Sequence, residues 1–317
     1  MNMRDAIQAL EAEAGDADRL VKSPLSQWRL VVRRFRGRRS GMIGLGIVLF
    51  LILVALLAPL LAPYSPNEIL IGKEEVSRYD PPCVHLFGCS DEKPQHIMGI
   101  DGNVRDEFSR VIYGSRVSLT LGFFTVTLAL LVGSILGALA GYRGGWLDNM
   151  IMRFMDVLLG FPSLLLAIAI VAVLGRGLRN ALLAIAIVTM PGYARVMRAQ
   201  VLAIKESDFV AASQALGASA FQVLIRRIIP NAMTPLVVLA TLGVATAILE
   251  AAGLSFLGLG AQPPMAEWGS MLASERNQVF TAPHLVFFPG LAIMITVLGF
   301  NLMGDGLRDA LDPTLHR

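Results

Sequence analysis

Six long apolar stretches dominate the pattern of the sequence, and polar or charged segments separate them. Each stretch approaches the roughly 20 apolar residues that a helix needs to cross a hydrocarbon core about 30 Å thick. Backbone groups in lipid must be satisfied within the chain, so we expect each stretch to be helical. The pattern predicts an all-α integral membrane protein with six transmembrane helices over about 42–61, 119–140, 150–174, 181–197, 234–254 and 285–303.

The polar connections between these stretches divide the chain into segments. We expect an N-terminal segment over 1–41, the first span over 42–61, a long loop over 62–118, a core of five spans over 119–305 and a tail over 306–317. Inside the core, the connections 200–231 and 255–283 are too long to be simple turns. Long connections in compact proteins often carry function, so we expect functional residues there.

Proline and glycine interrupt the apolar stretches. Pro162 and Pro191 fall inside the third and fourth spans, where we expect them to kink their helices. Gly133, Gly137 and Gly141 recur every four residues in the second span. Because small residues let helix backbones approach closely in lipid, this repeat predicts helix packing rather than a ligand site.

The charges agree with membrane insertion and predict an orientation. Charged residues make up 16% of the chain, below the about 25% of soluble domains. If both termini are cytoplasmic, eighteen of the 27 Lys and Arg residues fall in cytoplasmic segments. The positive-inside rule therefore predicts cytoplasmic termini and an extracytoplasmic loop over 62–118. No basic stripe on a soluble face is visible, so nucleic acid is not an expected partner.

The connection 206–231 contains two short amphipathic patterns on either side of Gly217. Phe209 and Leu216 can share one face of the first pattern. Glycine suits a turn with positive φ, and Pro230 opens the fifth span. The pattern supports two interpretations about equally: a contact surface for a cytosolic partner, or a connector that is solvated or lies on lipid.

A few other polar or aromatic residues need an interpretation. Glu250 and Asp156 lie near the ends of their spans, and we expect structural pairs there, with Arg153 close to Asp156, rather than substrate contacts. Trp268 suits an anchor at the membrane interface as well as a recognition role.

Two cysteines occur in the long loop. In the predicted topology Cys83 and Cys89 face an oxidising compartment, which favours a disulfide that closes a small loop. A zinc site that adds His85 and His96 is the less favoured alternative, and we expect no metal site.

The stretch from Ala211 through Gly217 to the Ile-Ile-Pro at 228–230 resembles the cytoplasmic coupling loop of ABC-importer permeases. Ala211 stands where that family has its characteristic glutamate, and Arg227 stands where many relatives have histidine. No carboxylate contact to an ATPase is therefore carried over at position 211. The resemblance implies a coupling helix over about 206–227 whose contacts to the ATPase involve Asp208, Ala211, Ala212, Gly217, Arg226, Arg227 and Pro230.

Three more stretches carry the resemblance, and they occur in the same order as in that family. Residues 98–119, 254–269 and 300–313 are similar to the C-type permease subunits of dipeptide, oligopeptide and nickel ABC importers. The resemblance implies the type I ABC importer permease fold with six transmembrane helices and a cytoplasmic coupling helix. The extracytoplasmic motif in the second stretch comprises Gln262, Pro263, Glu267 and Trp268.

The resemblance also implies a function and an assembly. The sequence contains no Gly-x-x-x-x-Gly-Lys-Ser/Thr loop, so we expect a non-enzymatic subunit without a cofactor, with ATP and Mg on two partner ATPase subunits. A second homologous permease subunit, an extracytoplasmic solute-binding protein and membrane lipid would complete the assembly in a bacterial inner membrane. The implied cargo is a di- or oligopeptide, and the alternative is a nickel chelate or a glutathione-like solute.

Three other classes of membrane protein fit the sequence less well. An ion-coupled secondary transporter would carry carboxylates near the bilayer midplane and often an internal repeat, whereas Glu250 and Asp156 lie near span ends. A membrane-embedded enzyme needs a cluster of catalytic side chains, and all four histidines lie in loops or in the tail. A plain membrane anchor leaves the pattern around Gly217 unexplained.

Overall fold

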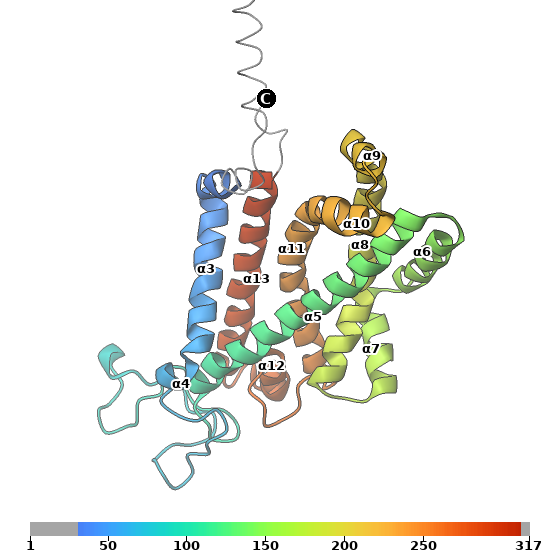
Figure 1. The fold of residues 1–317 in the computed structure, drawn as a ribbon. Helices are drawn as coiled ribbons and strands as arrows, with labels where there is room; N and C mark the ends of the chain where they lie inside the picture. The colour runs from blue at the N-terminus through green and yellow to red at the C-terminus, as the bar shows by residue number, and fades with distance from the viewer. Residues whose placement is uncertain (1–30, 312–317) are drawn as a thin grey trace, which may run out of the picture.

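The computed structural model describes residues 31–311, apart from the side chain of Phe87. Most of the predicted N-terminal segment and the end of the predicted tail therefore lie outside the described residues. Within the described range the chain is mostly helical, with residues 62–106 largely in loops and turns, and contains no β-strand (Figure 1). The elements are α3 (Arg39–Leu56), α4 (Ala58–Leu61), η1 (His85–Phe87), α5 (Glu107–Arg143), α6 (Gly145–Leu159), α7 (Ser163–Leu174), α8 (Leu178–Lys205), α9 (Asp208–Ala215), α10 (Ala220–Val223), the π-helical turn η2 (Leu224–Ile228), α11 (Ile229–Phe256), α12 (Trp268–Glu275), η3 (Arg276–Gln278) and α13 (His284–Leu311).

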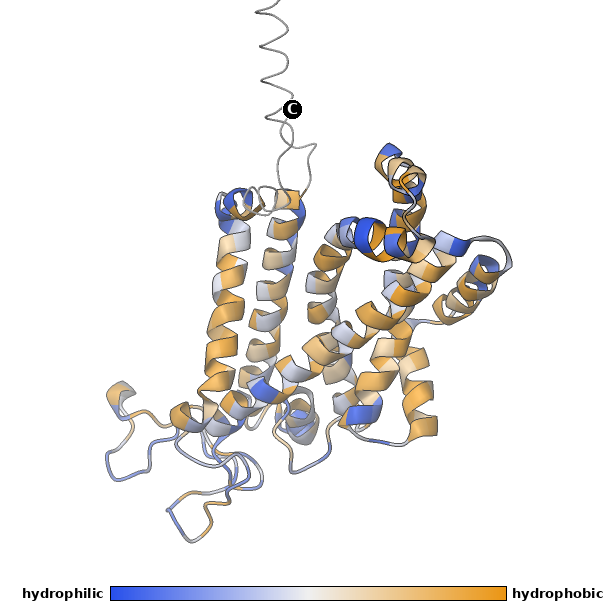
Figure 2. Cartoon of the chain, viewed as in Figure 1, coloured by the Kyte–Doolittle hydropathy of each residue, from blue (hydrophilic) through white to orange (hydrophobic). Residues whose placement is uncertain are grey.

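Six passes run through the bundle, as the hydrophobic pattern predicts. Five stretches are long and apolar enough to span a membrane: α3, α5, α8, the continuous helical stretch Ala220–Phe256, and α13. α6 and α7, 15 and 12 residues long, are apolar and long enough only as a pair, and counted as one broken span they make the sixth pass. Figure 2 shows hydrophobic residues along the passes and hydrophilic residues gathered near both ends. The prediction of an all-α membrane protein with six passes is confirmed.

The third pass is broken rather than kinked. α6 and α7 meet at 96° across a break of three residues that ends in Pro162. Pro162 has no N–H to continue the hydrogen bonds of α6, so the helix ends before it and a new helix begins after it. Pro191, in contrast, lies inside α8, which remains one helix.

The structure moves several boundaries of the predicted segments. α5 begins at Glu107 instead of about 119, where the carboxylate of Asp106 accepts a hydrogen bond of 2.7 Å from the N–H of Ser109. Ser109 and Ser115 are buried, so the polar residues before 119 pack against protein within a helix. The long loop therefore ends at residue 106, and the helical core begins there.

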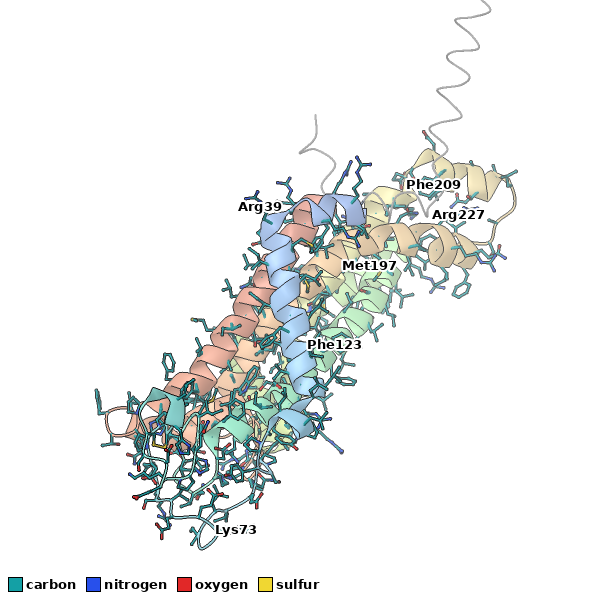
Figure 3. All side chains as sticks on the ribbon, turned by 90° about the vertical axis from the view of Figure 1, so that its left-hand side faces the viewer. Arg39, Lys73, Phe123, Met197, Phe209 and Arg227 are labelled. Carbon is teal, nitrogen blue, oxygen red and sulfur yellow. A yellow bond between two sulfur atoms is a disulfide. The ribbon has the colours of Figure 1, made fainter. Side chains whose placement is uncertain are left out.

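The bundle has two chemically different ends. The start of α3, the end of α13 and the α9–α10 region lie together at one end, which we call the basic end (Figure 1). Residues 62–106, which we call the loop segment, lie with α12 at the opposite end, which we call the loop end. Figure 3 shows Arg39, Phe209 and Arg227 at the basic end and Lys73 at the loop end.

Close packing of α5 on α8 explains the predicted glycine repeat. Gly133, Gly137 and Gly141 are all buried on the face of α5 that meets α8. A Cβ placed on Gly137 would lie 3.0 Å from the Cα of Ala194, which is backbone and cannot rotate away. The repeat therefore serves helix packing, as we expect from the sequence.

Two ion pairs attach α6 to α8. Asp148 accepts two hydrogen bonds from Arg198, of 2.5 and 2.6 Å, and its side chain is nearly buried. Asp156 pairs with Arg195 at 2.5 Å, and both side chains are more than half exposed. The expected structural pair of Asp156 is therefore formed with Arg195 of another helix, and the expected pairing with Arg153 is wrong.

These two pairs predict unequal effects of the same substitution. We expect Asp148→Asn to destabilise the protein by about 1.5–3 kcal/mol, because it weakens two hydrogen bonds to a charged group. We expect Asp156→Asn to cost less than about 1 kcal/mol, because exposed ion pairs contribute little. Thermal unfolding of the purified variants in one detergent measures the difference, and equal losses would contradict this ranking.

Candidate functional site

At the basic end, residues 208–228 form a helical hairpin, which we call the hairpin. α9 forms its first arm, and α10 with η2 forms its second. Ser219 caps α10 through a capping box, in which its hydroxyl accepts from the N–H of Gln222 and the Gln222 side chain accepts from the N–H of Ser219. Local sequence signals therefore begin the second arm where the structure places it.

Gly217 makes the turn between the two arms. Its φ is +86°, in the left-handed region that glycine adopts without a steric penalty. The N–H of Gly217 donates to Gln214 O at 2.9 Å, and the N–H of Ala218 donates to Ser213 O at 3.1 Å. Val210 and Val223 are fully buried and hold the two arms on the bundle. The turn predicted from the sequence is therefore present at this residue.

Large apolar side chains are exposed on the outer surface of the hairpin. Phe209 is 46% exposed, Phe221 73% and Leu216 89%. Arg226 and Arg227 are exposed beside them and form no ion pair with any residue between 31 and 311. A surface that combines large exposed apolar groups with free cations is typical of a site that another protein covers.

A hollow of about 340 Å³ lies between the arms of the hairpin. Its lining includes Gly217, Arg226 and Arg227, so the structure brings these three predicted contact residues together. Asp208, Ala211, Ala212 and Pro230 are exposed but do not line the hollow. Leu216 and Gln222 line it as well, although neither is among the contact residues that the sequence predicts.

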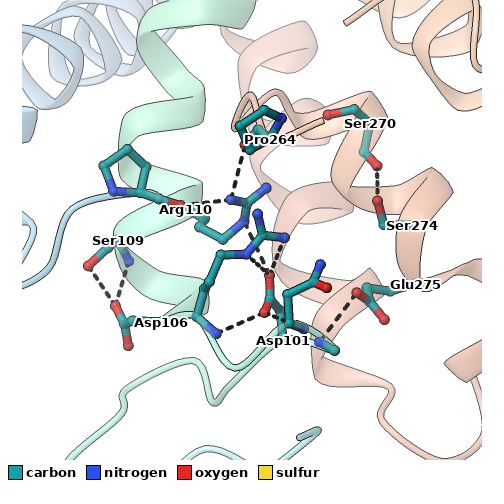
Figure 4. A network of polar contacts seen from close by, with 12 residues as sticks. Asp101, Asp106, Ser109, Arg110, Pro264, Ser270, Ser274 and Glu275 are labelled. Carbon is teal, nitrogen blue, oxygen red and sulfur yellow. Dashed lines mark hydrogen bonds and ion pairs between the residues drawn. The ribbon is translucent and has the colours of Figure 1, made fainter. Parts of the chain in front are cut away.

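A polar network holds the loop end together (Figure 4). Asp101 accepts from the Nε of Arg105 at 2.8 Å and lies 3.5 Å from the Nε of Arg110. Arg110 also donates to the carbonyl oxygens of Pro66 at 2.7 Å and Pro264 at 3.5 Å. Three segments that are distant in sequence therefore meet on one buried guanidinium.

The predicted extracytoplasmic motif is half exposed and half buried. Gln262 and Pro263 are exposed, whereas Glu267 and Trp268 are 2% and 1% exposed. Glu267 caps α12 by accepting from the N–H groups of Gly269 and Ser270, each at 2.9 Å. Of the two interpretations of Trp268, an anchor at the membrane interface or a recognition role, the anchor is wrong, because its indole is enclosed by protein.

The reason for this burial lies in α5. The indole N–H of Trp268 donates to the carbonyl of Val111 at 3.0 Å. Gly114 leaves room for the ring, since a Cβ there would lie 2.8 Å from the indole Cδ1. The motif therefore fastens α12 to the start of α5, and sequence periodicity carries no signal for such a contact.

His96 lies between two carboxylates in the loop segment. Its Nδ1 is 2.8 Å from Asp106 and its Nε2 is 3.1 Å from Glu74, while its side chain is only 3% exposed. The ring of Tyr64 packs beside it, with the ring centroids 5.5 Å apart. Because both ring nitrogens face carboxylate oxygens, the geometry favours the imidazolium, which donates from both.

This arrangement predicts a pH-dependent loop segment. Burial by itself lowers the pKa of His96, but the hydrogen bonds and charges of Asp106 and Glu74 outweigh it and raise the pKa above its usual value. A raised pKa in the folded state gives stabilisation that is complete below the unfolded pKa of about 6.5 and is lost as pH rises through the folded value. We therefore expect residues 74–106 to lose protection from amide hydrogen exchange as pH rises, after correction for the intrinsic exchange rate.

The matched control is His96→Gln, whose amide does not titrate in this range. Its protection is expected to be weaker than that of the wild type at low pH and to change little with pH. A His96→Gln variant that keeps the wild-type pH dependence would assign the effect to another group.

The loop segment also contains the predicted disulfide and the residues of the less favoured zinc site. The structure joins Cys83 and Cys89 in a disulfide, with their Cα atoms 5.4 Å apart. No group of three His, Cys, Asp or Glu residues within the described range has the arrangement to hold a metal ion. The Nε2–H of His85 donates to the carbonyl oxygen of Lys93, and both ring nitrogens of His96 face carboxylates.

Comparison with known proteins places this architecture in one family. Residues 133–317 match the family described as binding-protein-dependent transport system inner membrane component. Residues 26–82 match the N-terminal transmembrane domain of oligopeptide transport permease C. The first match covers more than half of the chain.

Several characterised proteins resemble the chain over nearly its whole length. A dipeptide transport system permease protein, DppC, of Alkalihalophilus pseudofirmus is 47% identical over 92% of this chain and 91% of its own length. A glutathione transport system permease protein, GsiD, of Pectobacterium atrosepticum is 43% identical over 94% of each chain. A GsiD of Escherichia coli is 45% identical over 91% of each chain.

A solved structure shares the fold. The inward-facing methionine ABC transporter MetNI superimposes with a TM-score of 0.53 over 64% of this chain and 96% of the matched chain, at 19% identity. That similarity supports the type I permease fold that the sequence predicts. The chain is thus a member of the binding-protein-dependent transport system inner membrane component family, and within it a C-type permease subunit of the dipeptide and oligopeptide ABC importers.

Proposed function

We propose that this permease subunit forms one half of a translocation pathway for di- and oligopeptides and receives the energy of ATP hydrolysis through the hairpin. The observation that carries the proposal is the exposed apolar and cationic surface around Gly217, Leu216, Arg226 and Arg227. Two ATPase subunits that bind ATP and Mg would each dock on a permease subunit, and this chain itself would have no catalytic activity.

The structure offers a mechanical route from the hairpin to the far end of the bundle. The helical stretch Ala220–Phe256 begins in the second arm of the hairpin and runs through η2 into α11 without a break. Val223 and Ile228 are fully buried, so the arm cannot move independently of the bundle. A displacement of the hairpin by a closing ATPase dimer would therefore tilt α11 and alternate access between the two sides.

We further propose that both termini and the hairpin are cytoplasmic and that the loop end faces an extracytoplasmic solute-binding protein. The basic residues of the described chain that gather at the start of α3 support this orientation through the positive-inside rule. A second, homologous permease subunit would form the other half of the pathway, because large apolar side chains such as Phe123 and Phe154 are exposed on this chain and are available to pack against it.

The proposed cargo follows from the relatives. The DppC relative is described as a dipeptide permease and the GsiD relatives as glutathione permeases, and both solutes are short peptidic compounds with free carboxylates. We therefore propose peptides as the cargo and keep glutathione-like solutes as the second candidate.

The test is uptake by the complete transporter in proteoliposomes, reconstituted from this chain, the second permease, the ATPases and the binding protein. We expect ATP-dependent accumulation of a labelled dipeptide that exceeds accumulation of glutathione or of a nickel chelate. Accumulation driven by a proton or sodium gradient without ATP would instead support the ion-coupled alternative. Preferential accumulation of glutathione would support the same ATP-driven transporter with glutathione, rather than dipeptides, as its cargo.

A further inference from the structure

A cluster of arginines lies at the basic end, away from the hairpin. Five arginines fall within seven residues: Arg33, Arg34, Arg36, Arg38 and Arg39. Arg33, Arg36 and Arg39 are exposed. Within residues 31–311, Arg38 alone of the five has an acidic partner, Asp309 at 3.7 Å. The cluster therefore presents several cations to its surroundings.

The cluster is held in a defined place. A Cβ on Gly41 would lie 2.9 Å from the ring of Phe35 and 3.0 Å from the Cα of Gly306, so the aromatic ring packs where α3 and α13 touch. Phe35 is in the middle of the arginine segment and attaches it to this crossing. The cations are thus fixed beside the ends of two membrane helices.

The arginines continue directly into an apolar face. α3 has 18 residues, a length of about 27 Å at 1.5 Å per residue, which matches a hydrocarbon core of about 30 Å. Its outward face is apolar, with Ile43 58% exposed, Phe50 62% and Leu53 53%. Arg39 begins this helix, so the cluster lies at the level where phospholipid headgroups meet the acyl chains.

We propose that this arginine cluster, with the outward face of α3 below it, binds anionic phospholipid. The guanidinium groups would hold the phosphates and acidic headgroups, and the exposed apolar residues of α3 would contact the acyl chains. This inference goes beyond the proposed function and does not depend on the cargo.

Charge and position favour a lipid over other occupants. A soluble anion such as inorganic phosphate has no apolar part, so it would leave the apolar face that adjoins the cations without a contact. The hairpin already supplies a separate surface for a protein at the same end, on α9 and α10. An anionic lipid satisfies both the cations and the apolar face at once.

The test uses the purified transporter complex with the full-length chain in nanodiscs. One set contains phosphatidylcholine alone, and the other contains about 30% phosphatidylglycerol, an anionic lipid of the kind that polybasic segments attract. Tightly held lipid is counted by native mass spectrometry after gentle release. We expect phosphatidylglycerol to be enriched at least about two-fold over its share in the bilayer, and about 1 M salt to reduce the enrichment through screening.

Variants connect the enrichment to the cluster. The triple variant R33Q/R36Q/R39Q is expected to lose the phosphatidylglycerol enrichment, and R33K/R36K/R39K is expected to keep most of this enrichment. The matched control R78Q/K93Q/R276Q removes three exposed basic residues from the loop end and is expected to behave as the wild type. Phosphate added at millimolar concentration should not compete.

Three results would overturn the proposal. The first is an absence of phosphatidylglycerol enrichment in the wild type. The second is equal enrichment in R33Q/R36Q/R39Q and in the control R78Q/K93Q/R276Q. The third is loss of the ATPase subunits from R33Q/R36Q/R39Q while its lipid retention is unchanged. The last result would assign the cluster to a protein interface. If R33Q/R36Q/R39Q fails to insert, the salt dependence and the phosphate competition on the wild-type complex decide the question.

Discussion

Gly137→Leu is expected to produce a protein that no longer packs α5 against α8 and that unfolds or aggregates during purification. A Cβ at this position would lie 3.0 Å from the Cα and the carbonyl carbon of Ala194, and three further carbons would have to displace backbone. Such overpacking costs about 1–3 kcal/mol where side chains yield, and backbone yields less. Because the contact between α5 and α8 is the largest between any two helices of the bundle, we expect the loss of this packing to destabilise the whole bundle.

The measurement is monodispersity on size exclusion and the midpoint of thermal unfolding in detergent. Gly46→Leu is the matched control, because Gly46 lies in α3 with no atom within 4 Å of a Cβ placed there. The control should purify and unfold as the wild type does. Equal damage from both substitutions would show that leucine in any membrane helix is harmful and that the α5–α8 contact has no special weight.

Gly217→Val is expected to abolish most coupled transport while the protein still inserts and folds. Valine at a φ of +86° places its Cβ against the following carbonyl, which costs about 1–2 kcal/mol or more for a branched side chain. The hairpin would relieve this strain by changing the angle between α9 and α10. A cost of that size shifts the native arrangement about ten-fold, so we expect a drop in ATP-dependent uptake of at least that order.

Gly217→Asn is the control for this substitution, because asparagine tolerates the left-handed region far better than valine does. It should keep most of the uptake, although it adds a side chain at the same place, where no atom lies within 4 Å of a Cβ. Uptake and ATPase activity are measured in proteoliposomes that contain equal amounts of each complex. If both variants lose uptake equally, bulk at the docking surface is decisive and backbone geometry is not.

The passes could be predicted because lipid imposes a simple rule on the sequence. A helix that crosses the bilayer must be apolar along its length, so apolar run length alone reveals it. The turn at Gly217 could also be predicted, since glycine between two amphipathic patterns indicates a positive φ. Both signals are local, and both agree with the structure.

Other features could not be predicted because their causes lie in distant segments. The start of α5 is polar in sequence, and its polar residues are helical because Asp106 caps them and other segments bury them. Tryptophan is a residue type that suits the membrane interface, but Trp268 packs against Val111 and Gly114 of α5. The partner of Asp156 is Arg195, 39 residues away on another helix, and not the neighbouring Arg153.

The hydrophobic pattern by itself determines that this chain is a six-pass, all-helical membrane protein, and the motif around Gly217 places the turn of the hairpin for which we propose a coupling role. Apolar transfer and local backbone preference are properties of single stretches, so one sequence is enough to read them. Only the tertiary structure decides which cations remain free at the hairpin and at the start of α3, and how Asp101, Arg110 and His96 fasten the loop segment. Those outcomes depend on which groups meet across the fold, because a charge or a hydrogen bond acts through distance in space rather than distance along the chain.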